Sequence, residues 1–230
     1  MTRLADQDRD ALKRAAARRA LELVAPGMVL GIGTGTTASL FIEGLAGMRV
    51  AVVATSDASA ALARAAGVEL LEDREDGPLD LAVDGADEID PALRLVKGNG
   101  GALFREKAVA LAARRFVVVA DDSKRVDRLG RTFVPVEVAP FLWRRTAQRL
   151  AAAAAVASWT LRGGEAQPYR TDNGNLILDL TFSGGLADPE GTAGAIKAVT
   201  GVLEHGLFLG LATGAIVAGP SGIEVLGSLD

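Results

Sequence analysis

Apolar runs of strand length alternate with helical runs over the first half of the chain, and this alternation constrains the fold more than any other feature. The runs MVLGIGTGTTASLFIEGLA and VAVVATSDASAALARAAG each pass from an apolar strand through small polar residues into a helix. Continuous apolar strands joined by helices are typical of a parallel sheet covered on both faces. We therefore expect functional residues in the loops at the carboxyl ends of the strands.

Neighbouring runs extend this predicted sheet. An amphipathic helix over residues 11–24 comes first and ends at Pro26 and Gly27. VELLED and LDLAVDGADEID add two strands, and GGALFREKAVALAARRFVVVADDSK is a helix that leads into another strand. The C-terminal run LGLATGAIVAGPSGIEVL returns to apolar strands punctuated by glycine. We expect it to complete the same sheet.

The pattern changes near Thr132, where a second set of elements begins. FVPVEVAP, SWTLR, NLILDLTF and VLEHGLF are predicted strands, and FLWRRTAQRLAAAAAVA and DPEGTAGAIKAVTG are predicted helices. Their order along the chain is β-α-β-β-α-β, the order of a ferredoxin-like unit. The predicted fold class is α/β, with a Rossmann-like, mostly parallel domain at 1–132 and 206–230 and a smaller ferredoxin-like α+β domain at 133–205.

Composition and net charge exclude several classes of function and of partner. The 230 residues are 49% apolar and carry a net charge of −4, which argues against a broad surface for nucleic acid. The absence of cysteine removes disulfides, thiolate catalysis and cysteine metal sites. No secretory pattern opens the chain, and no apolar run reaches the ~18 residues of a membrane span. We expect a cytoplasmic protein without nucleic-acid or membrane partners.

The first loop that could bind a ligand or take part in catalysis is GIGTGTT, residues 31–37, between a strand and a helix. Backbone N–H groups at such a helix start form an anion site, to which the hydroxyls of Thr34, Thr36 and Thr37 add donors. A dinucleotide is an alternative, since Asp57 lies near the spacing of the G-x-G-x-x-G fingerprint, but position 36 is threonine. A tight turn without a ligand is a third interpretation. We favour a phosphate monoester.

The second loop, DGADEID, follows the apolar strand LDLAV. Asp84 and Asp87 stand where a parallel sheet presents catalytic groups. Clustered carboxylates bind Mg²⁺ or Ca²⁺, but these aspartates come at every third position, whereas an EF-hand loop has ligands at every second one. We therefore predict no metal. An aspartate that satisfies backbone donors at a turn would explain one of these residues more easily than all of them.

The third loop is KGNGGALFREK, with Lys97 at the end of a short strand and Glu106 on the first turns of the following helix. Taken alone, Glu106 is most simply a surface glutamate paired with Arg105 or Lys107. A carboxylate near a lysine and two aspartates, partly dehydrated beside glycine loops, instead has its pKa moved towards neutrality and can act as a proton-transfer base. Lys124, in ADDSK, adds a cation after the next strand.

With these loops in order, the chain resembles the A-type ribose-5-phosphate isomerases. The motifs LKRAA, PGMVLGIGTGTTA, TSDAS, VDGADEID, KGNGGALFREK, ADDSK, PVEV, TDNGN and GLF follow one another almost from end to end. The resemblance implies an enzyme that interconverts D-ribose 5-phosphate and D-ribulose 5-phosphate in the non-oxidative pentose phosphate pathway without metal or cofactor. It also implies a homo-oligomer, usually a dimer, and supports the two predicted domains.

The resemblance further implies a role for each matching residue. Glu106 is the base that takes the proton from C2 of the open-chain aldose and returns it to C1. Lys97 and the backbone of residues 98–101 stabilise the oxyanion of the cis-enediolate. Asp84 and Asp87 bind sugar hydroxyls and help ring opening or proton exchange at O1 and O2. The implied substrate-binding residues are Thr34, Gly35, Thr36, Thr37, Asp84, Gly85, Ala86, Asp87, Lys97, Gly98, Asn99, Gly100 and Lys124, with Lys13 as a further phosphate contact.

Two positions depart from the family's pattern, and two other function classes stay open. Asn99 replaces a glycine of the usual K-G-G-G run, but asparagine tolerates left-handed backbone, so we expect the loop to survive. Phe104 stands where threonine is common. A non-catalytic sugar-phosphate sensor would keep the threonine loop but need neither Glu106 nor Lys97. A dehydrogenase is disfavoured by the missing third glycine.

Overall fold

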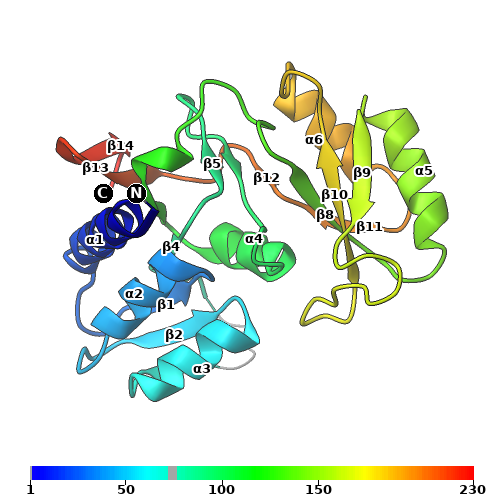
Figure 1. Cartoon of the computed structure of the whole chain (residues 1–230). Helices are drawn as coiled ribbons and strands as arrows, with labels where there is room; N and C mark the ends of the chain where they lie inside the picture. Colours follow the sequence, from blue (N-terminus) through cyan, green and yellow to red (C-terminus); the bar gives the residue numbers. More distant parts are fainter. Residues whose placement is uncertain (1, 72–76) are drawn as a thin grey trace. The chain divides into compact units, whose positions relative to one another are not determined.

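The computed structural model describes residues 2–71 and 77–230, with side chains from Asp8 onward. The chain divides into two compact units (Figure 1). The first unit consists of Met1–Ala86, Arg105–Lys124 and Gly210–Asp230, and the second of Asp87–Phe104 and Arg125–Leu209. These units are defined by packing, and the predicted domain limits at 132/133 and 205/206, which come from the pattern of elements, stay a prediction.

A seven-stranded sheet in the order β14-β13-β7-β4-β1-β2-β3 forms the centre of the first unit. Its strand pairs are parallel except for β13 with β14, within the described residues. The order reverses at β1, which lies between β2 and β4, and ligands of such sheets bind at the carboxyl ends of the strands at this point. The strands are β1 (Val29–Ile32), β2 (Ala51–Ala54), β3 (Glu69–Leu70), β4 (Leu81–Asp84), β7 (Phe116–Asp121), β13 (Gly214–Gly219) and β14 (Gly222–Gly227).

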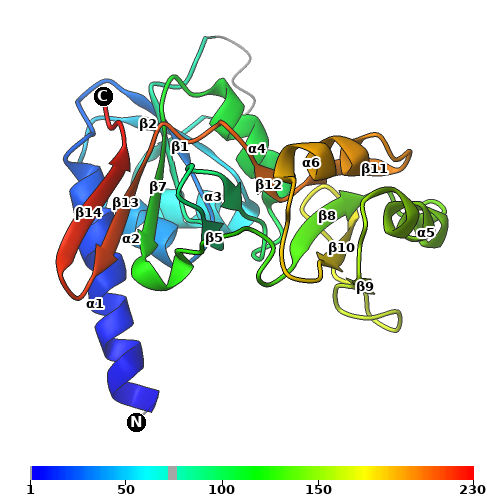
Figure 2. The ribbon, with the colours of Figure 1, turned by 90° about the horizontal axis from the view of Figure 1, so that it is seen from above.

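Helices cover this sheet and form the core of the first unit with it. Helix α1 packs small residues, Ala16, Ala17 and Ala20, into the core that Phe41 of α2 fills. Figure 2 shows α1 lying along β7 and β13. Helix α1 begins well before the predicted residue 11 and ends at Leu21. The helices are α1 (Thr2–Leu21), α2 (Thr36–Gly44), α3 (Asp57–Ala65), α4 (Leu103–Ala112) and the short 3-10 helix η1 (Asp122–Lys124).

A four-stranded antiparallel sheet, in the order β11-β8-β10-β9, forms the larger part of the second unit. Helices α5 and α6 pack on one face, where Leu150 and Ile196 meet Val136 and Leu178. The element order β8-α5-β9-β10-α6-β11 is the predicted β-α-β-β-α-β. The elements are β8 (Val134–Val138), α5 (Trp143–Ala153), β9 (Ser158–Leu161), β10 (Leu176–Thr181), α6 (Pro189–Lys197) and β11 (Val202–His205).

A third, small antiparallel sheet also belongs to the second unit and was not predicted. It has the order β12-β6-β5, with β5 (Glu88–Ile89), β6 (Leu95–Val96) and β12 (Leu207–Phe208). The predicted single strand VLEHGLF is therefore two strands in different sheets. The chain changes sheets at Gly206, where a side chain would lie 2.2 Å from the carbonyl oxygen of Lys97. Likewise, LDLAVDGADEID contains both β4 and β5.

The predicted fold class is confirmed: a mostly parallel central sheet is accompanied by a smaller antiparallel α+β arrangement. The C-terminal run completes the first sheet as β13 and β14, as expected. The predicted strand VELLED is shorter, since β3 is Glu69–Leu70, and its residues Glu72 and Asp73 lie outside the described part.

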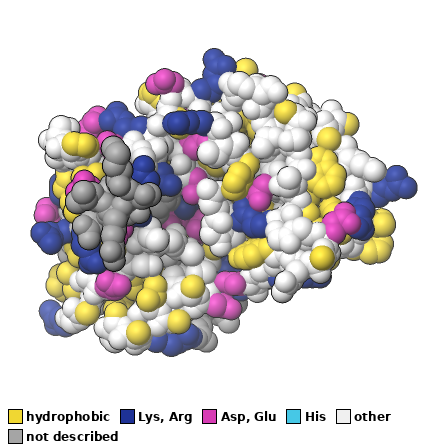
Figure 3. Space-filling view, in the orientation of Figure 1, with side chains coloured by type: hydrophobic (Ala, Val, Ile, Leu, Met, Phe, Trp, Pro, Cys, Tyr) yellow, Lys and Arg dark blue, Asp and Glu magenta, His cyan; other side chains and the backbone are white. Residues whose placement is uncertain are grey.

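In the described ranges, no helix combines the length and the apolar character needed to cross a bilayer. On the face shown in Figure 3, Lys and Arg side chains stand among Asp and Glu side chains. The described part of this face therefore mixes both signs of charge.

Candidate active site

Asp84, at the end of β4, is held against the loop that follows β1. Its Oδ1 accepts the N–H of Thr34 at 3.1 Å and the N–H of Gly85 at 2.7 Å. Gly33 permits this contact, because a side chain at that position would lie 1.9 Å from Asp84 Oδ1. Asp84 is only 3% exposed. Two of the predicted sites, the threonine loop and the first aspartate, thus lie together at the carboxyl end of β1, where the strand order of the sheet reverses.

The N-terminus of α2 has the features of an anion site. The N-cap, Gly35, has φ 111° and provides no side-chain acceptor for the first N–H groups of the helix. Those groups carry the positive end of the helix dipole. Thr36 is exposed beside them. The Thr34 hydroxyl, predicted as a ligand donor, instead donates to Ser56 Oγ at 2.8 Å and lies 2.9 Å from Thr55 Oγ1, so it fixes the loop.

Glu106 lies on the first turn of α4, as predicted, and is only 4% exposed. The helix is anchored to the sheet at Gly31, where an added side chain would meet Val109 at 2.3 Å. Arg105 donates to Asp57 at 3.1 Å, which ties the start of α4 to the start of α3. The interpretation of Glu106 as a surface residue is therefore wrong.

Lys124 ends the 3-10 helix η1 after β7 and is half-buried. Its ammonium group makes no hydrogen bond or ion pair with any residue of the described ranges. A cation in this position at the carboxyl end of a parallel strand is available to an anionic ligand.

In the second unit, Lys97 follows β6 and is 3% exposed. Its N–H donates to the carbonyl of Gly206 at 2.8 Å, and its Nζ lies 5.5 Å from the centre of the Phe208 ring. The backbone of this lysine is thus held by Gly206, just before β12, and its side chain lies over Phe208 of β12.

Asp87 is tied to the glycine loop of the same unit. Its backbone N–H donates to Val96 at 2.8 Å, and its Oδ2 accepts the N–H of Asn99 at 3.0 Å. Positive φ occurs at Gly98 (103°) and Gly101 (88°), whereas Asn99 has no left-handed backbone. Asn99 therefore fits the loop with an ordinary backbone conformation, and the left-handed conformation that we expected asparagine to tolerate is not needed.

Two residues that were not predicted from the sequence hold this loop. Arg162, just after β9, donates through Nη1 to the carbonyls of Gly98 and Asn99, each at 3.0 Å. Tyr169 donates to the carbonyl of Gly100 at 3.3 Å, and its ring lies where a side chain on Gly101 would be. Both residues are far from the loop in sequence, and neither belongs to a motif that points to it.

Tyr169 is expected to ionise at unusually high pH. Burial, reinforced by the charge of Asp172, raises the pKa of Tyr169 above its ordinary value of 10.0, while Arg162 opposes the shift. It is the only tyrosine, so tyrosinate absorbance reports this residue alone. Its midpoint should be higher in the folded than in the unfolded chain, and Tyr169→Phe should abolish the transition. Because the folded chain retains this proton, stability should fall as pH rises past about 10. Equal midpoints would contradict the assignment.

A buried carboxylate organises the segment that carries Tyr169. Glu137, in the middle of β8, is 0% exposed. Its Oε1 accepts from Thr171 Oγ1 at 2.9 Å, Asn173 Nδ2 at 3.2 Å and Asn175 Nδ2 at 2.8 Å. The motif TDNGN therefore forms a turn built around the glutamate of PVEV.

Glu137→Ala should lower the free energy of unfolding by about 3 kcal/mol, because the buried Thr171 hydroxyl and the side-chain amides of Asn173 and Asn175 lose their shared acceptor. Glu137→Gln should cost less, since its amide oxygen can still accept. Trp143 and Trp159, the only tryptophans, both lie in the second unit, so denaturant unfolding followed by tryptophan fluorescence reports the affected part. Glu165→Gln, an exposed glutamate of the same unit, is the matched control. If Glu137→Ala lowered the free energy of unfolding no more than Glu165→Gln does, the hydrogen bonds of Glu137 would not stabilise this unit.

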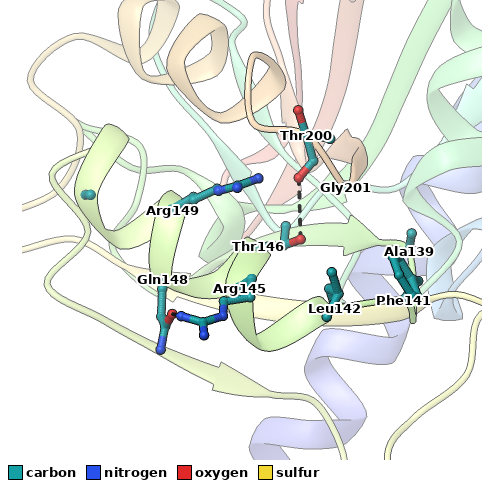
Figure 4. A pocket seen from close by; sticks show the side chains of 10 residues that line it. Ala139, Phe141, Leu142, Arg145, Thr146, Gln148, Arg149, Thr200 and Gly201 are labelled. Atoms are coloured by element: carbon teal, nitrogen blue, oxygen red, sulfur yellow. Dashed lines mark hydrogen bonds between the residues drawn. The ribbon is translucent and has the colours of Figure 1, made fainter.

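The second unit also has a hollow that contains none of the predicted site residues. This cavity, about 720 Å³ in volume, lies beside α5 and the turn at Thr200 and Gly201 (Figure 4). Two of its lining residues are joined by a hydrogen bond, which the Thr146 hydroxyl donates to the Thr200 carbonyl at 3.4 Å. Over the described ranges, no three His, Asp or Glu side chains gather in a way that could hold a metal ion.

Comparison with known proteins agrees with the motifs. The sequence profile of ribose 5-phosphate isomerase A (phosphoriboisomerase A) matches residues 51–222. A ribose-5-phosphate isomerase A of Roseiflexus castenholzii is 51% identical, over 93% of this chain and 94% of the relative. The structure of ribose 5-phosphate isomerase A from Neisseria gonorrhoeae has a TM-score of 0.89 at 36% identity, over 96% of this chain and 98% of that one.

A further solved structure is that of a D-ribose-5-phosphate isomerase in complex with phospho-erythronic acid, at 34% identity and a TM-score of 0.89 over 96% of this chain and 99% of that one. The similarity to the relative and to the two solved structures extends over nearly the whole chain. This chain belongs to the ribose 5-phosphate isomerase A family.

Proposed function

We propose that this protein interconverts D-ribose 5-phosphate and D-ribulose 5-phosphate by proton transfer, with Glu106 as the base. Family membership supports the substrate pair, and the burial of Glu106 on the first turn of α4 is the observation that carries its role. A carboxylate that is held on an anchored helix and shielded from water is suited to positioned proton transfer.

The reaction divides into two proton transfers. The Glu106 carboxylate removes the proton from C2 of the open-chain aldose, and the electron pair of that C–H bond forms the C1–C2 double bond of a cis-enediolate while O1 takes the negative charge. The carboxylic acid then returns the proton to C1, and O2 becomes the carbonyl oxygen of the ketose once its proton has moved to O1. No electrons leave the sugar, so the step needs no redox partner.

The other predicted residues take supporting roles in this proposal. Lys97 and the N–H groups of the glycine loop stabilise the charge that develops on the enediolate oxygens. Asp84 and Asp87 bind sugar hydroxyls and assist ring opening or proton exchange between O1 and O2. The N-terminus of α2 and Lys124 bind the phosphate, which is supported by the uncapped N–H groups of α2 and by the unpaired ammonium of Lys124 among the described residues.

Phospho-erythronic acid, the compound named in the related complex, supports this chemistry. Its carboxylate carries two oxygens on one planar carbon, so it resembles the O1–C1–C2–O2 edge of the enediolate more closely than it resembles the aldose. A site built to stabilise the enediolate should therefore bind this acid more tightly than substrate.

The direct test is conversion of ribose 5-phosphate to ribulose 5-phosphate by the purified chain in excess EDTA without nucleotide. We expect steady turnover, because the proposed roles use only side chains and backbone. Binding of the sugar phosphate without turnover would move the protein to the sensor class. Turnover that disappears in EDTA and returns with Mg²⁺ would contradict the metal-free mechanism.

The remaining proposals concern the compartment, the pathway and the oligomeric state. We propose that the enzyme acts in the cytoplasm, in the non-oxidative pentose phosphate pathway, and as a homodimer. Family membership supports the pathway, whereas the compartment and the dimer remain expectations from the sequence. Light scattering should give a mass twice that of one chain, and a monomer mass would contradict the dimer.

A further inference from the structure

The glycine loop of residues 98–101 is held from one side by side chains of the β9–β10 connection. Arg162 Nη1 reaches the carbonyls of Gly98 and Asn99, each at 3.0 Å. The next carbonyl, that of Gly100, accepts from the Tyr169 hydroxyl at 3.3 Å. Three successive carbonyls of the loop therefore point towards the same two side chains.

Arg162 is itself fixed in place. Its Nε donates to Asp179 Oδ2 at 3.0 Å and its Nη2 to Asp179 Oδ1, which makes a bidentate pair. Both side chains are largely buried, at 15% and 13% exposed. The guanidinium carbon also lies 5.6 Å from the Phe133 ring centre and 5.9 Å from that of Tyr169. A planar guanidinium that is paired and stacked in this way has little freedom, so it positions what it binds.

The consequence for the loop concerns its N–H groups. In a planar trans peptide the C=O and the N–H point in opposite directions, so a carbonyl directed at Arg162 turns the following N–H away from it. The N–H of Asn99 is taken by Asp87 at 3.0 Å, and that of Gly101 by the Gly98 carbonyl at 3.0 Å. Among the described residues, the N–H of Gly100 donates to no protein acceptor.

The contact of Arg162 with the Asn99 carbonyl also makes the Gly100 N–H a stronger donor. The carbonyl of Asn99 and the N–H of Gly100 belong to one peptide group. A charged donor on the carbonyl withdraws electron density through that group, and hydrogen bonds in such a chain reinforce one another. The N–H of Gly100 is thus both aimed and polarised by the guanidinium on the opposite side of the loop.

We propose that Arg162 is a positioning residue for catalysis, which orients and polarises the Asn99–Gly100 peptide so that the Gly100 N–H binds the enediolate oxyanion. Tyr169 supports the adjoining carbonyl in a weaker contact. This inference rests on the proposed isomerase function and adds to it one particular donor and the side chain that prepares it.

The test compares Arg162→Lys with wild type, under conditions in which tryptophan fluorescence shows each protein to be folded. Lysine keeps the positive charge, but one ammonium group cannot serve both oxygens of Asp179 and both carbonyls. We expect kcat to fall on the order of 10- to 100-fold, while KM changes by less than about threefold. The inhibition constant of phospho-erythronic acid should weaken by about the same factor as kcat/KM, since that acid resembles the enediolate.

Arg170→Lys is the matched control. Arg170 lies in the same connection and also donates to a backbone carbonyl, that of Gly174 at 3.0 Å, but among the described residues it makes no hydrogen bond to the glycine loop. Its kinetic constants should stay within about twofold of wild type. Should Arg162→Lys fail to fold, Asp179→Asn leaves the arginine in place and loosens its orientation, and a smaller loss of the same pattern is expected.

Several results would overturn the inference. They are an unchanged kcat in Arg162→Lys, a pure KM effect, a loss equal to that of Arg170→Lys, or a lower kcat with undiminished affinity for phospho-erythronic acid. The last would indicate a structural defect elsewhere. If wild type and Arg170→Lys turn over while Arg162→Lys behaves like them, only this inference fails. Absence of turnover in wild type would refute the proposed function, and this inference with it.

Discussion

Glu106→Gln is expected to lower kcat for ribose 5-phosphate by about 10³- to 10⁴-fold, at the upper end of what a positioned base contributes. The glutamine amide has nearly the same size and can occupy the same buried position on α4, but it cannot accept the C2 proton. Because the side chain removes a proton in the transition state and does not bind the phosphate, KM should change little. Initial rates at several substrate concentrations measure both constants.

The control for this variant is the same substitution at an exposed position. Glu43→Gln on α2 removes one carboxylate from the first unit without touching any residue of the proposed site. It should leave both constants unchanged. If Glu106→Gln turned over as fast as wild type, Glu106 would not be the base, and Asp84 and Asp87 would be the next carboxylates to test.

Lys97→Met should lower kcat by about 10²- to 10³-fold, the loss expected when one donor to a developing oxyanion is removed. Methionine keeps an unbranched apolar stem that can pack near Phe208, so the substitution removes mainly the ammonium group. Since the negative charge on the enediolate exists only after proton removal, the substrate's ground state loses less than its transition state does. The fall in kcat should therefore exceed the rise in KM.

Lys197→Met is the matched control for the lysine. Lys197 is in the same unit, at the end of α6, and its Nζ pairs with Glu204 at 2.9 Å. It should retain full activity. A Lys97→Met variant that shows only a higher KM would mean that Lys97 binds substrate and transition state equally, and its role in charge stabilisation would have to be abandoned.

Most of the fold could be predicted because the apolar runs have strand length and the segments between them have helical spacing. Strands such as Val29–Ile32 and Phe116–Asp121 are buried along their length, which is why they appear as continuous apolar runs. Short strands were harder. β5 has two residues and was not separated from β4, because a two-residue strand leaves no periodicity of its own, whereas β6, equally short, was predicted as the strand before Lys97.

The candidate site was predictable to the extent that its residues follow strand ends. Asp84, Lys97 and Glu106 occupy the predicted positions at the end of β4, after β6 and on the first turn of α4. Their burial could not be read from a local pattern, since each is charged. It depends on contacts such as that of Lys97 with Phe208 on the strand β12, which follows more than a hundred residues later in the chain.

The supporting residues could not be predicted for the same reason. Arg162 lies 64 residues from Gly98, and only the folded second unit brings the two together. Glu137 is 38 residues from Asn175, although PVEV and TDNGN were both recognised as motifs. A buried polar strand residue that needs partners, together with an amide-rich turn that offers donors, is the one signal that could have suggested their pairing.

Isomerisation by proton transfer through an enediolate can be checked by isotope exchange. Ribose 5-phosphate should be converted by wild type in D₂O with excess EDTA, and deuterium at C1 of the ribulose 5-phosphate measured by NMR. We expect deuterium at C1, because the proton passes through a carboxylic acid that can exchange with solvent, and no such product with Glu106→Gln on the same timescale. If neither the product nor the recovered substrate contained deuterium, and Glu106→Gln converted the sugar as fast as wild type, hydrogen would pass directly between C2 and C1, and proton transfer through Glu106 would be refuted.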